Sequence, residues 1–231
     1  MDASLATALG LGLLLGLRHA LDADHVAAVS TLVTRERGIA RSCLLGAFWG
    51  AGHTTALLAA GLAVVAFKLT IAPAVEAALE RLVGLVLVLL GAHVLLRAVG
   101  SLAVHGHEHK HAGTTHRHPH LHLGSSEPGH VHLVRFGGRP FVVGLLHGLA
   151  GSAALTLVVL STIPSPVGAL VYILVFGLGS TAGMLLLSGL VGLPVAMAAR
   201  QGVRLQMALQ VVAGLGSAAL GAWMLAGFAG T

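Results

Sequence analysis

Hydrophobic residues fill six long stretches of the chain, and short polar links separate these stretches. A helix needs about 20 predominantly apolar residues to cross a bilayer, and each stretch is about that long or longer. The pattern therefore predicts an all-α, polytopic membrane protein with about six transmembrane helices. The predicted spans are residues 3–33, 42–67, 82–99, 141–161, 167–193 and 205–229.

The composition supports a membrane protein. Of the 231 residues, 56% are hydrophobic and only 9% are charged, whereas a soluble domain is about 25% charged. This length allows one helical domain and no separate soluble one. The first span opens with Met-Asp-Ala-Ser and has no basic residue at its start, so we expect it to be retained and not cleaved as a signal peptide. The lipid bilayer is thus the first predicted partner.

The basic residues indicate the orientation of the chain. They do not cluster into the basic patch that a nucleic-acid-binding surface requires, so nucleic acid is not an expected partner. Ten of the thirteen lie in or beside three alternate links, which would share one side of the membrane. The positive-inside rule makes that side cytoplasmic, with both termini outward, in a multi-pass protein of the plasma (inner) membrane. The ten are Arg35, Arg37, Arg41, Arg97, Lys110, Arg117, Arg135, Arg139, Arg200 and Arg204.

One charged segment, RHALDADHV, interrupts the first span from Arg18 onward. Each charge near the bilayer centre costs roughly 2.5–3.5 kcal/mol on insertion scales, so these groups need partners or a bound cation. On a regular helix His19, Asp22 and His25 share a face. Asp24 points away from that face unless the helix is broken. Imidazole and carboxylate suit a divalent first-row transition metal; the alternative is an Arg18–Asp22 structural pair at i,i+4 with two structural histidines.

The second half of the chain resembles the first half in sequence. The segment GLLHGLAGS from Gly144 aligns with GLRHALDAD from Gly16, and GLGST from Gly177 aligns with GAGHT from Gly50. In both alignments the two matching segments are separated by nearly the same number of residues. Because each repeat contains three helices, an odd number, the second copy would enter the membrane from the opposite side. The sequence therefore predicts an inverted 3+3 repeat, which in transporters places the substrate site at the repeat interface.

Two further histidines follow from this pattern. His53 comes after two glycines in the second span, and glycines allow the close helix approach that would bring it toward the first span. His147 is the counterpart of His19 in the second repeat. We expect both to join the metal site. The first repeat would comprise residues 1–100 and the second residues 140–231.

Residues 101–139 differ in kind from the rest, because they hold ten of the fifteen histidines, mostly at every second position. Their prolines, glycines and serines do not favour a packed core, so we predict a disordered cytoplasmic loop. Histidine-rich tracts bind metal, and imidazole accepts Ni²⁺, Co²⁺, Cu²⁺ and Zn²⁺ alike. The ten are His105, His107, His109, His111, His116, His118, His120, His122, His130 and His132.

The segment RHALDADHV resembles the signature of the nickel–cobalt transporter family, in which a histidine is followed after four residues by Asp-His. The matching residues are His19, Asp24 and His25. Gly52-His53-Thr54 is similar to a second motif of that family. The resemblance implies a membrane permease with Ni²⁺ or Co²⁺ as transported substrate and no catalytic cofactor. The absence of acidic residues after Glu127 suggests a short branch resembling the transporters grouped with urease accessory proteins. The candidate metal ligands are His19, Asp22, Asp24, His25, His53 and His147.

Other functions remain open at this point. The chain has no GxxxxGK[ST] loop, so we expect a secondary permease that does not hydrolyse ATP. Uptake is expected, since the resemblance is to uptake permeases, but an efflux permease would need the same residues. A histidine-rich membrane di-iron oxygenase, a haem redox protein and a membrane-anchored metal store are weaker alternatives. The sequence does not indicate the oligomeric state.

The orientation can be tested by cysteine labelling once Cys43, the single native cysteine, has been replaced. A cysteine introduced by Ser125→Cys should react only with reagents that reach the cytoplasm. One introduced by Ala72→Cys should react with impermeant reagents applied from outside. The reverse pattern would overturn the six-span orientation.

Overall fold

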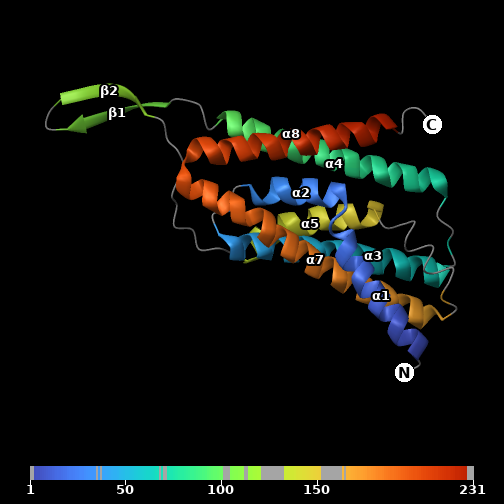
Figure 1. Ribbon diagram of the computed structural model, residues 1–231. Coiled ribbons are helices and arrows are strands. Elements are labelled where there is room, and N and C mark those ends of the chain that lie inside the picture. The colour runs from blue at the N-terminus through green and yellow to red at the C-terminus, as the bar shows by residue number, and fades with distance from the viewer. Residues whose placement is uncertain are drawn as a thin grey trace.

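The computed structural model describes residues 3–34, 36, 38–67, 69, 72–100, 105–111, 114–120, 133–151, 163 and 165–227. These residues form helices and one pair of strands (Figure 1). The elements are α1 (Ala3–His19), α2 (Ala23–Val33), α3 (Ile39–Phe67), α4 (Pro73–Gly100), β1 (His105–His111), β2 (Thr114–His120), α5 (Leu133–Gly151), α7 (Pro166–Gln201) and α8 (Val203–Gly227).

The helical prediction for the membrane region is confirmed. Four helices, α3, α4, α7 and α8, are long and apolar enough to cross a bilayer. The third predicted span is longer than expected, because α4 already begins at Pro73, a residue type that is favoured in the first turn of a helix. The fourth predicted span corresponds to α5 as far as Gly151, and its remainder lies outside the described residues.

The first predicted span is broken into α1 and α2. At the end of α1 the amides of Leu21 and Asp22 bond to the carbonyls of Arg18 and His19, three residues back, at 2.8 and 3.1 Å. These tighter turns end the helix. Asp22 is extended (φ −62°, ψ 148°) and is the N-cap of α2. Aspartate favours helix N-termini, where its charge complements the helix dipole, so the sequence Asp-Ala-Asp suits a restart here.

The helices form a bundle with α2 in its interior (Figure 1). Helix α3 packs against both α5 and α7, α1 packs along α7, and α4 pairs with α8. Helix α2 contacts α4, α7 and α8. The strand pair and the α7–α8 junction lie at one end of the bundle, whereas the start of α1 and the end of α8 lie at the other (Figure 1). The short helix α2 is therefore enclosed by the longer ones.

Glycines bring the helix backbones into direct contact. A Cβ atom at Gly16 of α1 would collide with the carbonyl oxygen of Phe176 on α7. A Cβ at Gly144 of α5 would likewise collide with the carbonyl oxygen of Trp49 on α3. In both helices a histidine follows one turn later, at position 19 or 147. The glycine contacts thus hold these histidine-bearing turns close to α7 and α3.

Part of the predicted histidine-rich loop forms a pair of strands in the structure. Strands β1 and β2 pair in antiparallel fashion within the range that we assigned to a disordered loop. Helix α5 begins at Leu133, within the range predicted for this loop, and the division of the chain into two repeats and a loop stays a prediction. Histidine at every second position matches the two-residue period of a strand. Residues 101–104, 112–113 and 121–132 lie outside the described residues.

The glycine contact of α1 makes a testable prediction. Gly16→Ala should destabilise the folded protein by about 1–3 kcal/mol, because the added methyl group overpacks the α1–α7 contact. Gly10→Ala in the same helix is the control, since a Cβ there meets nothing within 4 Å. Thermal unfolding of the detergent-solubilised protein measures both. Equal unfolding temperatures for the two variants would contradict this packing role.

Candidate metal centre

Four histidines from four different helices meet inside the bundle. They are His19 at the end of α1, His25 in the first turn of α2, His53 in α3 and His147 in α5. None is more than 5% exposed. The ring centroids of His25 lie 4.5 Å from those of His19 and His147, and 5.3 Å from that of His53. The structure therefore brings together all four histidines that the sequence predicts for the bundle.

Asp24 bridges two of these histidines. Its Oδ1 atom accepts hydrogen bonds from the backbone amide and from Nδ1 of His25, at 2.9 and 3.0 Å. Its Oδ2 atom lies 3.0 Å from Nε2 of His147. On an unbroken helix Asp24 would point away from the cluster, so the break between α1 and α2 is what turns it inward. The positive N-terminal end of α2 further stabilises this carboxylate.

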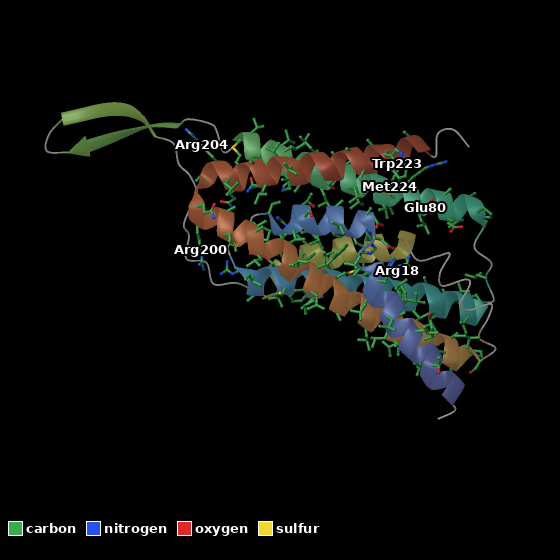
Figure 2. All side chains as sticks on the ribbon, viewed as in Figure 1. Arg18, Glu80, Arg200, Arg204, Trp223 and Met224 are labelled. Atoms are coloured by element: carbon green, nitrogen blue, oxygen red, sulfur yellow. The ribbon has the colours of Figure 1, made fainter. Side chains whose placement is uncertain are left out.

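Asp22 contacts His19, and the Arg18–Asp22 pair, the alternative drawn from the sequence, is not found among the described residues. The Asp22 Oδ2 atom lies 2.8 Å from Nδ1 of His19, and the side chain is 53% exposed. The i,i+4 geometry of a regular helix is lost because α1 ends between the two residues. Arg18 is exposed beside an apolar groove between α1 and α7 (Figure 2). It makes no ion pair with any residue that the structure describes.

The two carboxylates decide which nitrogen of each ring carries a proton. An ionised carboxylate can only accept hydrogen bonds, so the ring nitrogen that faces it must be the donor. The opposite nitrogens, His19 Nε2, His25 Nε2 and His147 Nδ1, then carry free lone pairs. These atoms are buried and have no hydrogen-bond partner among the described residues, and the same holds for both nitrogens of His53. Buried polar atoms normally have partners, so these lone pairs are suited to hold a cation.

Two overlapping groups have the spacing of a metal site. His19, His25 and His53 each offer one ligand atom within 4.8 Å of the others, and so do Asp24, His25 and His147. His25 belongs to both groups. The first group is entirely buried, and each of its three rings has at least one nitrogen without a hydrogen-bond partner among the described residues. The carboxylate of the second group already contacts both of its histidines. The all-histidine group therefore accepts an ion with less rearrangement.

Two aromatic residues that sequence reasoning did not single out enclose the cluster. The ring of Trp49 lies 5.3 Å from that of His25 and 5.6 Å from that of His147. The ring of Phe176 lies 5.4 Å from that of His19. Both rings are buried and help to keep water from the histidines. The sequence did contain a signal, since Trp49 and Phe176 each come directly before the aligned segments that begin at Gly50 and Gly177.

A cavity of about 950 Å³ lies between α2, α3, α4 and α5, and three of these helices (α2, α3 and α5) also carry histidines of the cluster. Its polar lining residues are Thr31, Glu36, His93, Arg97 and Arg139. Leu45 also lines it and belongs to the same apolar cluster as Val29 and Trp49. Apolar packing thus adjoins both the cavity and the histidines.

The loop histidines are separate from this centre. Seven of the ten lie in β1 and β2, at one end of the bundle (Figure 1). His122, His130 and His132 lie outside the described residues.

Comparison with known proteins identifies the family. Residues 5–213 match the NicO family, described as high-affinity nickel-transport protein. The chain belongs to the NicO family. It is also 38% identical over 221 residues to the urease accessory protein UreH of Bacillus sp. (strain TB-90), which covers 94% of this chain and 90% of that protein. No solved structure matches. This NicO protein is therefore a multi-pass membrane transporter for nickel and not an enzyme, which excludes the oxygenase and haem alternatives.

The role of Asp24 can be tested by Asp24→Asn. An amide has one acceptor oxygen and one donor nitrogen, so it cannot accept from both His25 and His147, and one ring must change its tautomer. Loss of such an orienting partner typically costs about 10–100-fold in metal affinity or activity. The half-saturating Ni²⁺ concentration in a proteoliposome uptake assay should rise accordingly. Glu76→Gln in the first turn of α4 is the charge-matched control, and equal values for the two variants would refute the proposed role of Asp24.

Proposed function

We propose that this protein is a secondary permease that carries Ni²⁺ or Co²⁺ through the buried histidine cluster. The observation that supports this most directly is the set of lone-pair nitrogens without hydrogen-bond partners among the described residues in a membrane bundle. An ion that leaves water must exchange its hydration shell for protein ligands. Neutral imidazoles provide them for nickel and cobalt, whereas Mg²⁺ and Ca²⁺ prefer oxygen ligands.

In this proposal His19, His25 and His53 hold the ion. Asp22 and Asp24 act behind them, each fixing the orientation and tautomer of a ligating ring. The two carboxylates also balance the double charge of the ion, so that the loaded site is close to neutral. A neutral site lowers the cost of placing the ion in a low-dielectric environment.

We further propose six spans arranged as an inverted 3+3 repeat. Each glycine contact from the first half to the second half has a counterpart at the aligned positions, in which the glycine comes from the second half and its neighbour from the first half. Gly16 packs on Phe176 as Gly144 packs on Trp49, because the second pair occupies the aligned positions. Gly50 against Thr181 and Gly177 against Thr54 form another such set. The histidine cluster lies where these contacts meet, which is where a repeat transporter holds its substrate.

The cavity beside the cluster suits the cytoplasmic part of the pathway. It is lined by residues near the ends of α2 and α4 and the start of α5, which the positive-inside rule assigns to the cytoplasmic side. Leu45 and its apolar neighbours would separate the cavity from the ion until the repeats move against each other. Arg97 and Arg139 would then discourage a cation from remaining in the cavity.

Uptake is the proposed direction, and efflux by the same residues is the second candidate. The family description, high-affinity nickel transport, favours uptake, because high affinity is useful for collecting a scarce ion. The histidine-rich segment on the cytoplasmic side would hold metal after it has entered. It lies outside the bundle, so we do not expect the transport step to need it.

Transport assays test this function. Cells that produce the protein should accumulate more Ni²⁺ or Co²⁺ than control cells, and the double variant His19→Ala, His25→Ala should abolish the gain while the protein still inserts. Removal of two histidines outside the bundle by His116→Ala, His118→Ala is the matched control, and deletion of residues 105–132 should also leave transport intact in kind. Transport by the His19, His25 variant would refute the site. Lower accumulation with better metal tolerance would indicate an exporter.

A further inference from the structure

Two arginines from different helices line the cavity between α2, α3, α4 and α5. Arg97 comes from the last turn of α4, and Arg139 comes from α5. Neither makes an ion pair with another residue that the structure describes. We propose that this cavity binds the headgroup of an anionic phospholipid, whose phosphate is held by the two guanidinium groups.

The charge of the cavity lining favours an anion. Two arginines and one carboxylate, that of Glu36, line the cavity, so positive charge is in excess. Both arginines and His93 are exposed, which leaves their polar ends accessible to a ligand. A guanidinium group can donate two parallel hydrogen bonds to a phosphate, which suits arginine to this ligand. The hydroxyl of Thr31 already donates to the carbonyl of Ala28 at 2.7 Å, so the charged side chains are the principal donors.

The walls of the cavity change from charged to apolar along the helices. In α4, Arg97 lies about 10 Å closer to the end of the helix than Leu90, because each residue of a helix rises 1.5 Å. In α5, whose first turns line the same cavity as the last turns of α4, Arg139 precedes Val143 by about one turn. A phospholipid has the same order, with a charged phosphate at the membrane surface and acyl chains beneath it. A soluble anion has no part that would contact the apolar walls.

The size and the location of the cavity also fit a lipid. Its volume of about 950 Å³ lies near the upper end of the range of ligand sites, about 300–1,000 Å³. Basic pockets between transmembrane helices on the cytoplasmic side bind anionic headgroups. The assignment of this end of the bundle to the cytoplasm rests on the proposed function. A bound phosphate there would offset the charge of Arg97 and Arg139, so the departing ion would meet less repulsion.

Two pairs of substitutions distinguish this site from a general attraction between basic residues and the membrane surface. The variant Arg97→Gln, Arg139→Gln removes both cations of the cavity. The variant Arg200→Gln, Arg204→Gln is the control, because these exposed arginines lie at the α7–α8 junction and do not line the cavity (Figure 2). Both variants lose two positive charges, so a general attraction would weaken equally in both.

A second pair of substitutions changes the space in the cavity without changing its charge. Val142 lines the cavity and is 53% exposed, so Val142→Trp should fill part of the apolar wall. Val167→Trp in α7 is the control, since Val167 is 71% exposed and does not line the cavity.

The experiment uses the full chain in detergent and measures bound lipid by native mass spectrometry. Phosphatidylglycerol should bind more tightly than phosphatidylcholine with the same acyl chains, because only the former carries a net negative charge. The Arg97, Arg139 variant should bind phosphatidylglycerol about tenfold or more weakly, and the Arg200, Arg204 variant should change by no more than about twofold. Val142→Trp should weaken binding and Val167→Trp should not. Equal losses within either pair, or equal binding of the two lipids, would overturn the proposal.

A further measurement separates a lipid from a soluble anion. Glycerol 3-phosphate carries the phosphate of the headgroup without acyl chains, so at equal concentration it should not displace phosphatidylglycerol. Displacement at equal concentration would make a soluble anion the occupant and would refute the lipid site.

The result can be separated from the proposed transport function, because lipid binding in detergent needs no ion movement. If the native protein takes up no Ni²⁺ into proteoliposomes while phosphatidylglycerol binding depends on Arg97 and Arg139, the permease function fails and the lipid site stands. If uptake is normal and binding does not depend on these arginines, the lipid site fails alone.

Discussion

The structure depends on one requirement, which is that Asp24 keep a negative charge inside a membrane bundle. Burying a carboxylate without hydrogen-bond partners is unfavourable. In this protein two imidazoles and a backbone amide in the first turn of α2 contact the Asp24 carboxylate and offset that unfavourable energy. All three partners exist only because the first span breaks after His19. The break exposes the N-terminus of α2 and turns the side chain of Asp24 toward His25 and His147. A continuous helix would leave the same residues with no common centre.

The carboxylates in turn prepare the histidines for a metal ion. Each ring that faces a carboxylate has its proton fixed on that side, so the lone pair points to the other side. Glycine contacts then place these turns against α3 and α7 at backbone distance. Buried aromatic rings exclude water from the cluster. The helix break, the glycine packing and the imidazole tautomers therefore act together to form the proposed transition-metal site.

The histidines of this protein lie in two separate regions, the bundle and the strand pair. In the bundle, four buried rings gain their order from helix packing before any ion arrives. A second set of histidines lies in β1 and β2, whose backbones pair in antiparallel register outside the bundle (Figure 1). The first arrangement suits selective passage of a dehydrated ion.

The sequence by itself determined the class of the protein, because hydrophobicity and charge act locally. Long apolar stretches predicted the helices, and a charged motif within one of them predicted His19, His25, Asp22 and Asp24 as a unit. Alignment of the two halves added His147, whose contact with Asp24 joins residues far apart in the chain. Only the tertiary structure decided that Asp22 and Asp24 contact imidazoles, that Arg18 is excluded, and that Trp49 and Phe176 close the site. These outcomes depend on where the helix breaks and on how neighbouring helices cross, and no periodicity within a single segment contains that information.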